Sequence, residues 1–216
     1  DGSLFSTLLS QPRSADWRRT ATWLYGLEGT TAVVGTGYEL LLLTNHGDLI
    51  RTLDAPGEAC SPRHWWDSST VLVRCLAPEI LSYLPEGNYG RLWLVPLDGS
   101  AATALTALPA GPVDIVEFGY SDARRVDGRV FAQWTGDCGA ADIRLIAADG
   151  TATGLTGQSL VGLRGGQLVV RRWDACDLTP GSLHLVSLEG SDRETLFEPP
   201  TDGPGVIDAL MLRDLP

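Results

Sequence analysis

The three histidines and one serine are the residues whose types could support nucleophilic catalysis or metal binding. The three histidines, His46, His64 and His184, lie in separate segments of the chain. Residues 119–123, Gly-Tyr-Ser-Asp-Ala, resemble a nucleophile elbow but lack its last glycine and its strand-to-helix context. We therefore predict neither a catalytic triad nor a zinc site, and we interpret Ser121 as a turn residue.

Paired carboxylates, which could catalyse glycoside hydrolysis, are the second candidate. A glycosidase needs two carboxyl groups about 5–10 Å apart. Asp114 and Glu117 on one expected strand, with Asp208 on another, are the available candidates. They occupy too few strands to form a convincing axial pair, so we predict no catalytic residue. A propeller hydrolase, or the gating propeller of a larger peptidase, is kept as the alternative function.

Four aspartates lie on two loops that occupy equivalent places in the chain. They are Asp137, Asp142, Asp174 and Asp177. Calcium takes about 6–8 oxygen ligands in one place, and solvated loop acids are the commoner outcome for such residues. We predict no cofactor and no metal ligand here, with calcium as the alternative.

The four cysteines include no C-x-x-C pair, which favours structural disulfides over zinc. A hairpin that turns at Asp67 and Ser68 places Cys60 directly opposite Cys75, within disulfide range. Cys138 and Cys176 lie on matching loops, so we pair them with each other. Two disulfides indicate an oxidising compartment, and we expect a secreted or cell-envelope protein.

The candidate residues lie in a chain that is built of repeated units. Turn glycines recur at Gly2, Gly47, Gly99, Gly150 and Gly190, at intervals of 45, 52, 51 and 40 residues. Each ends one strand and begins a return strand, as in a propeller of four-stranded antiparallel blades. We predict an all-β fold over residues 1–216 as one domain. Four blades are complete and a closing blade is partial, so the chain is five-bladed or part of a larger propeller.

The third repeat is expected to begin with a strand at residues 113–118. A charged turn over residues 121–128 and a second strand over residues 129–134 should follow it. Residues 78–89 form an insertion between the second and third strands of the repeat before it. Long loops of this kind often carry function, although packing over the blade is the more frequent role.

Composition limits the partners. The net charge is −11, which argues against nucleic acid and anionic membranes. No apolar run is long enough to span a bilayer. All 16 basic residues are arginine, a composition typical of a GC-rich bacterial genome.

The repeats resemble those of the TolB-like, WD-type β-propeller family. The resemblance rests on Leu92-Trp93-Leu94-Val95 before the Asp98-Gly99 turn, on the Leu-Thr endings at residues 105–106 and 155–156, and on the start at residues 60–65. Residues 196–197 depart from the Leu-Thr ending, and the start lacks the family's Asp-Gly. The resemblance implies a periplasmic or secreted propeller that binds other proteins, and it supplies no catalytic residue.

We therefore predict a non-catalytic protein-binding module. Its surface would be the three loops between second and third strands, which should gather at one end of the ring. The candidate binding residues on these loops are Glu79, Tyr83, Glu86, Tyr89, Asp137, Asp142, Asp174 and Asp177. The acids suit a basic protein partner, and the two tyrosines are candidate aromatic anchors.

Overall fold

The computed structural model describes residues 22–25, 30–37, 39–77, 89–109, 117–136, 141–156, 158–172 and 181–199. All regular secondary structure in these ranges is β-strand, as the sequence predicts. Within the same ranges no helix has the length and apolar character that a membrane span requires.

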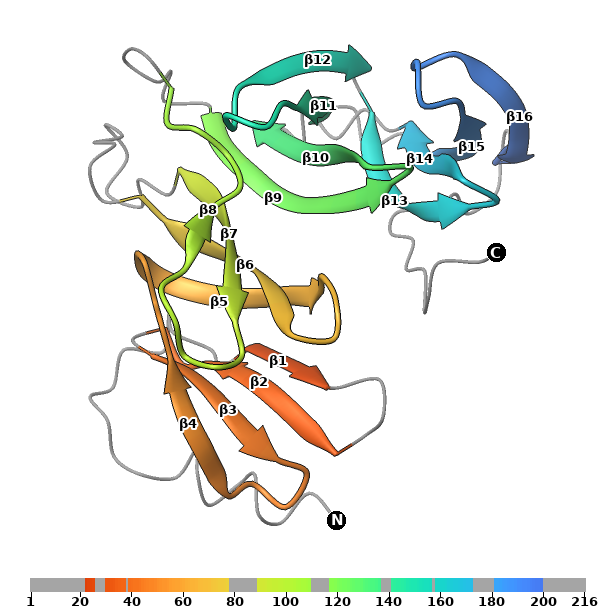
Figure 1. Ribbon diagram of the computed structural model, residues 1–216. Coiled ribbons are helices and arrows are strands. Elements are labelled where there is room, and N and C mark those ends of the chain that lie inside the picture. Colours follow the sequence, from red (N-terminus) through yellow and green to blue (C-terminus); the bar gives the residue numbers. More distant parts are fainter. Residues whose placement is uncertain are drawn as a thin grey trace. The chain divides into compact units, whose positions relative to one another are not determined.

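Along the chain the described strands follow one another in four groups of four, which Figure 1 shows in chain order from red to blue, and hydrogen bonds join them into two four-stranded sheets and one eight-stranded sheet. Their bounds are β1 Thr22–Tyr25, β2 Thr31–Gly35, β3 Leu40–Thr44, β4 Leu49–Leu53; β5 Glu58–Trp65, β6 Thr70–Leu76, β7 Gly90–Pro96, β8 Thr103–Ala104; β9 Glu117–Val126, β10 Arg129–Gly136, β11 Ala141–Ile146, β12 Ala152–Thr156; β13 Ser159–Arg164, β14 Gln167–Arg172, β15 Ser182–Val186 and β16 Asp192–Phe197. Neighbours within each group pair antiparallel, and one parallel bridge joins Gly90 of β7 to Gly119 of β9. No sheet of the described residues closes into a barrel.

The chain divides into two compact units. The first comprises residues 1–79 and 91–105, and the second comprises residues 80–90 and 106–216. Unit 1 therefore contains β1–β6, most of β7, and β8, whereas unit 2 contains β9–β16.

The core of unit 1 lies between β1–β4 and β5–β7. Leucine and valine runs in β2, β3 and β6 give strands with few polar side chains, and their residues are buried in the sheet faces. The core residues are Val33, Leu40, Leu42, Leu53, Cys60, Val71, Val73, Cys75 and Val95. The outer strand β4 is exposed at its first four residues, so the buried side chains concentrate on the inner strands.

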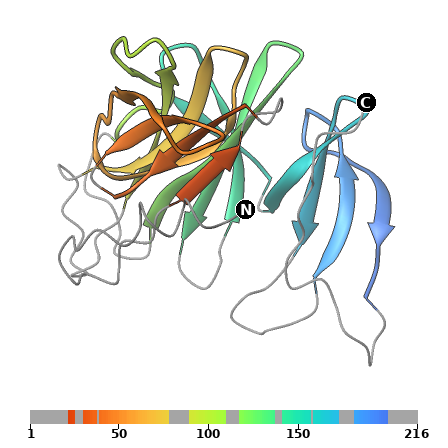
Figure 2. The same ribbon diagram turned by 90° about the horizontal axis from the view of Figure 1, so that it is seen from below.

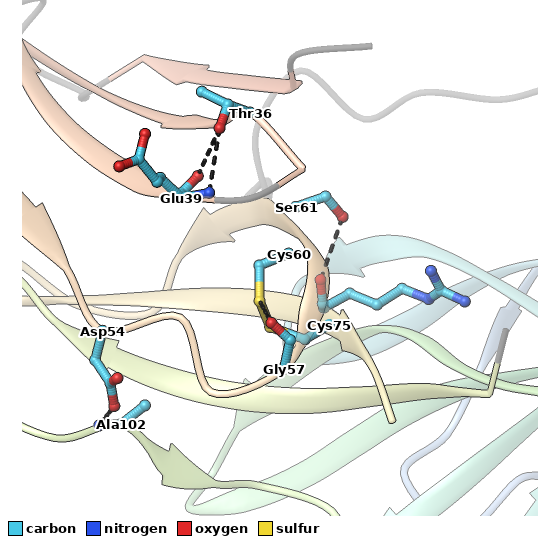
Figure 3. The surroundings of a disulfide bond; sticks show 9 residues. Thr36, Glu39, Asp54, Gly57, Cys60, Ser61, Cys75 and Ala102 are labelled. Carbon is cyan, nitrogen blue, oxygen red and sulfur yellow. Dashed lines mark hydrogen bonds between the residues drawn. A yellow bond between two sulfur atoms is a disulfide. The ribbon is translucent and has the colours of Figure 1, made fainter. Parts of the chain in front are cut away.

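A disulfide between Cys60 of β5 and Cys75 of β6 lies in this core (Figure 3). The two Cα atoms are 4.0 Å apart and the side chains are buried, which confirms this predicted pairing. Asp54 lies nearby and its Oδ2 accepts a 2.8 Å hydrogen bond from the Ala102 amide, which links the end of β4 to the segment before β8. The predicted Cys138–Cys176 pair lies outside the described residues.

Unit 2 has its own core between β9–β12 and β13–β16. Phe131, Ile143, Leu163, Leu168, Val170 and Val186 form this core. Gln133 of β10 is buried beside it and ties the two groups together. Its Nε2 donates to the Trp134 carbonyl over 2.7 Å, and its Oε1 accepts from the Leu160 amide of β13. Figure 2 shows β13–β16 of this unit, coloured from teal to blue, as a single sheet.

Four of the five predicted turn glycines lie in turns of the structure and have left-handed backbone conformations. Gly47, Gly99, Gly150 and Gly190 have φ angles of 88°, 82°, 82° and 85°. Each lies between the third and fourth strands of its group, where a left-handed residue closes the hairpin. Gly2, the fifth glycine of the series, lies outside the described residues.

One expected turn is wrong. Residues 121–126 belong to the long strand β9, and the turn is confined to Asp127 and Gly128. The charged run tolerates strand pairing because Arg124 bonds Asp122, two residues away on the same face, at 2.8 Å. Ser121 therefore lies within a strand, so the nucleophile-elbow context is absent.

Candidate functional site

The candidate site is built at the start of the third strand of each group, directly after the loop from the second strand. Only Tyr89 and Asp142 of the predicted binding residues are described. The predicted residues outside the described ranges are Glu79, Tyr83, Glu86, Asp137, Asp174 and Asp177.

Tyr89 does not act as an exposed aromatic anchor. Tyr89 is only 4% exposed, and it directly precedes β7. An aromatic ring that has been removed from solvent in this way contributes to packing, and it offers little surface to a partner. Tyr83 remains the one aromatic candidate in the loop before it.

Asp142 is held in an aromatic-cationic cluster of unit 2. Its Oδ2 accepts a 3.0 Å hydrogen bond from Arg144 Nε, and both side chains are about a quarter exposed. The Arg144 guanidinium lies 4.4 Å from the centre of the Trp134 ring and 5.9 Å from that of Tyr120. Stacking and ion pairing together fix the guanidinium, so the Asp142 charge is partly neutralised within the chain.

Trp134 contributes an unusual donor to this cluster. Its indole Nε1 is buried and has no hydrogen-bond partner among the described residues. A buried donor without a partner costs about 1–3 kcal/mol relative to a satisfied one. Trp134 pairs with Asp142 across β10 and β11, so its position is set by the strand register.

The same two positions carry interacting side chains in two other groups. Arg144 lies six residues before its turn glycine, and Trp93 and His184 occupy that position in their groups. The positions eight residues before the glycine hold Arg91, Asp142 and Ser182. Arg91 stacks on Trp93 at 4.5 Å, and Ser182 Oγ lies 2.7 Å from His184 Nε2.

These side-chain pairs were not predicted from the sequence. Their signal was present, because the equivalence of positions follows from the turn glycines alone. Side-chain interaction at the two positions, however, became visible only in the structure. Asp142 was chosen as a loop acid, whereas the structure places it on β11 at a recurring paired position.

His184 is the one buried histidine among those described. It is 6% exposed, and its Nδ1 lies 3.3 Å from Thr195 Oγ1 of β16. Burial lowers the pKa of His184 below 6.5, and the positive charge of Arg172 lowers it further. Asp192 and Glu198 act in the opposite direction, and Arg172 and Asp192 form an ion pair beside it.

The Ser182–His184 pair has the spacing of a nucleophile and its base, but its surroundings suit a structural role. The second ring nitrogen faces the Thr195 hydroxyl, whereas a triad places a carboxylate there to stabilise the imidazolium. A lowered pKa also makes the imidazole a weaker base. His46 is exposed in the β3–β4 turn, and His64 lies on β5 with its Nδ1 beside the Trp65 carbonyl.

Stability is expected to fall with acidification because of His184. The pKa of His184 in the folded chain lies below its unfolded value. At a pH above both values the imidazole is neutral in both states, and protonation of His184 then takes nothing from the free energy of unfolding. As the pH falls through the unfolded pKa, the unfolded chain binds a proton first, and stability decreases until the folded pKa is passed.

The measurement is the melting temperature of the wild type and of His184→Gln between about pH 8 and about pH 5. Glutamine keeps hydrogen-bonding capacity toward Ser182 and Thr195 but does not titrate. The wild type should lose more stability than the variant over this interval. Parallel curves would show that His184 makes no such contribution.

The remaining candidates are the carboxylates considered as catalytic groups and as metal ligands. Within the described ranges, no three His, Cys, Asp or Glu side chains are grouped to hold a metal ion. Glu117 begins β9, and Asp114 and Asp208 lie outside the described residues.

No protein-family model and no curated protein matches the chain. Among solved structures, the chain is similar to a candidate TolB protein from Agrobacterium tumefaciens, with 16% sequence identity and a TM-score of 0.41. The likeness covers 84% of this chain and 82% of that one. Both the identity and the TM-score are low, so this likeness says nothing about the function of the chain.

Proposed function

We propose that the chain is a β-propeller, or part of a larger one, which binds a basic protein outside the cytoplasm and carries out no catalysis itself. The observation that carries this proposal is a pair of interacting side chains that recurs at the start of the third strand. In three groups this position holds a fixed polar or aromatic pair, directly after the loop from the second strand. Rigid strands that present loops at equivalent positions suit recognition.

Charge supports the kind of partner. The net charge of −11 is spread over 27 acidic and 16 basic residues, and the loops after β6, β10 and β14 contain acids at equivalent positions. Because Asp142 is paired with Arg144, the contact surface is proposed around Glu79, Glu86, Asp137, Asp174 and Asp177. Complementary charge accelerates association and makes it sensitive to salt.

The disulfide supports the compartment. Cys60–Cys75 is a structural disulfide in the core of unit 1, and such bonds persist in secreted and envelope proteins and are rare in the cytosol. We therefore place the protein in the periplasm, in the cell envelope or outside the cell.

The test is affinity capture from the envelope fraction of the source organism at low and high salt. The variant Glu79→Gln, Glu86→Gln, Asp137→Asn and Asp174→Asn removes four charges from the proposed surface. Four exposed ion pairs at about 0.5 kcal/mol each amount to about 2 kcal/mol, so partner affinity should fall about thirtyfold. The captured protein should be basic, and its retention should decrease with salt.

The matched control neutralises four exposed acids elsewhere, Asp48→Asn, Glu58→Gln, Asp127→Asn and Glu194→Gln. It changes the net charge equally, so it separates a local surface from general attraction. If both variants capture the partner as the wild type does, the acidic loops are not the contact surface.

A further inference from the structure

Aspartate directly followed by glycine occurs five times in the chain, and three of these pairs lie in described turns: Asp98-Gly99, Asp127-Gly128 and Asp149-Gly150. The other two, at residues 1–2 and 202–203, lie outside the described residues. Glycine has no Cβ, so its amide nitrogen can approach the carboxyl carbon of the preceding aspartate closely. The same dipeptide is therefore present in three structural settings, which decide whether that nitrogen reaches the carboxyl group.

The Asp127-Gly128 pair has the most open of these settings. β9 ends at Val126 and β10 begins at Arg129, and these two residues pair with each other, so Asp127 and Gly128 alone form the hairpin turn. Both turn residues are exposed, and a Cβ built on Gly128 meets nothing within 4 Å. Among the described residues, neither the Asp127 carboxylate nor the Gly128 amide has a hydrogen-bond partner. The two groups that would react are therefore not held by other contacts.

The backbone of this turn also approaches the geometry of ring closure. Asp127 and Gly128 have φ angles of 50° and 74°, which define a type I′ turn in a two-residue hairpin. Rotation of the peptide group between them converts it to a type II′ turn, in which the first residue keeps a positive φ and has ψ of about −120°. At that ψ the Gly128 nitrogen eclipses the Asp127 Cβ, as a ring through Cγ requires. Glycine permits both turns because it adopts either sign of φ.

The carboxylates of the other two pairs are held by hydrogen bonds. Asp98 Oδ1 accepts from the Ser100 amide at 2.9 Å and from the Ser100 hydroxyl at 2.7 Å. Asp149 Oδ1 accepts from the Thr151 amide at 3.0 Å and from the Thr151 hydroxyl at 2.6 Å. The hydroxyl bonds first, and then the amide bonds, lower the pKa of Asp98 and of Asp149 below the ordinary value. Both aspartates are therefore kept ionised, and an ionised carboxylate resists attack by a nucleophile.

The glycine nitrogens of those two turns are engaged as well. The Gly99 amide donates to the Pro96 carbonyl at 3.4 Å, and the Gly150 amide donates to the Ala147 carbonyl at 2.9 Å. Each nitrogen must give up this bond before it can turn toward the preceding carboxyl group.

The backbone angles separate the three aspartates in the same way. Among the described non-glycine residues only Ala59 and Asp127 have positive φ, so Asp98 and Asp149 have negative φ. At negative φ, a ψ of about −120° lies outside the main allowed regions for an L-residue. The geometry of ring closure is therefore accessible at Asp127 and opposed at the other two aspartates.

We propose that Asp127 of the folded chain is a site of self-modification, at which attack by the Gly128 nitrogen converts aspartate to isoaspartate. The nitrogen attacks Cγ of the protonated carboxyl group. The N–Cγ bond forms, a Cγ–O bond breaks, and the amide proton leaves with the hydroxyl oxygen as water. A second water then adds to the main-chain carbonyl carbon of the succinimide and breaks the bond from that carbon to the Gly128 nitrogen. The main chain now runs through Cγ, the former main-chain carbonyl is a free carboxylate, and the only other reactant is water.

The product fits the tip of the hairpin. Its main chain is longer by one methylene group, and the exposed turn beyond Val126 and Arg129 has space for it. The net charge is unchanged, because one carboxylate replaces another, and the mass is unchanged as well. Detection of the reaction therefore requires an isotope.

The test is incubation of the folded full chain in water enriched in heavy oxygen, at a mildly acidic pH where part of an ordinary aspartate is protonated. After digestion in ordinary water, mass spectrometry measures heavy oxygen at each aspartate, and chromatography separates the isoaspartyl peptide. Each ring that opens leaves one solvent oxygen. Label at Asp127 should exceed label at Asp98 or Asp149 at least about tenfold, because two hydrogen bonds must first break at each of those carboxylates.

Two controls separate the effect of the fold from that of the dipeptide. In the chain unfolded by guanidinium chloride, all three aspartates should acquire label at similar rates, because each is followed by glycine and the turns are absent. The variant Asp127→Glu keeps the charge but would need a larger ring. It should lose the label at position 127 and leave the small amounts at Asp98 and Asp149 unchanged.

Three results would overturn the proposal. Equal labelling of the three aspartates in the folded chain would mean that the dipeptide alone sets the rate. An unlabelled Asp127 in the folded chain, with label in the unfolded chain, would mean that the hairpin prevents ring closure. Label retained at position 127 of Asp127→Glu would assign the wild-type signal to direct oxygen exchange of an exposed carboxyl group.

Discussion

Replacing Cys60 and Cys75 with alanine is expected to lower the free energy of opening of the β5–β6 hairpin by about 3 kcal/mol. The disulfide closes a loop with a sequence separation of 15 residues, so it restricts the unfolded chain over the whole hairpin. Both residues also belong to the core of unit 1, so alanine removes buried sulfur contacts in addition.

Native-state hydrogen exchange of the β5 and β6 amides measures this directly and requires no assumption that the two units unfold together. The β14 and β15 amides of unit 2 serve as the internal control and should keep their opening free energies. Mutation is preferable to reduction, because a reductant would also act on Cys138 and Cys176. A change in β5 and β6 below about 1 kcal/mol would contradict the expected constraint.

The pairing of these cysteines was predictable, although the turn that predicts it is not the one observed. A two-residue turn at Asp67 and Ser68 sets Cys60 opposite Cys75. In the structure the hairpin closes through Trp66–Thr70, and Trp65 pairs with Val71, one residue out of that register. An irregularity between Pro62 and His64 restores the register, so that Pro62 pairs with Val73 and the cysteines come together.

The turns were predictable because their chemistry is local. In two of them an aspartate precedes the glycine, and its carboxylate accepts a hydrogen bond from the backbone amide of the residue that follows the glycine. Asp98 Oδ1 accepts from the Ser100 amide at 2.9 Å, and Asp149 Oδ1 accepts from the Thr151 amide at 3.0 Å. Such bonds involve neighbouring residues only, so a single sequence contains the information. The repeat, and with it the order of the strands, follows from these positions.

The paired side chains at the strand starts were not predictable in the same way. The contact of Arg144 with Trp134 depends on the register between β10 and β11, and that register includes no local signal. The burial of Tyr89 and His184 likewise depends on what packs over them. Residues 121–126 were misassigned because a charged run is typical of a turn, whereas here Arg124 and Asp122 pair along a strand.

Gly119→Ala is expected to destabilise unit 2 far more than Gly128→Ala, although both glycines have φ of +74°. At Gly128 an added Cβ meets nothing within 4 Å, so only the left-handed conformation opposes alanine, at about 1–2 kcal/mol. At Gly119 the Cβ would lie 2.5 Å from the Gly90 carbonyl oxygen and 2.7 Å from the Gly90 nitrogen. These are backbone atoms, which cannot rotate away as a flexible side chain can.

The clash should therefore displace the backbone and break the single bridge between Gly90 and Gly119, adding at least about 2 kcal/mol beyond the conformational cost. Thermal unfolding of the two variants gives the total effect, and hydrogen exchange in β9 locates it. Tyr89 Cδ1, which lies 3.1 Å from the same Cβ position, should become more exposed to solvent as the backbone separates. Equal losses in the two variants would mean that the Gly90–Gly119 approach does not constrain unit 2, and that only the turn conformation requires glycine.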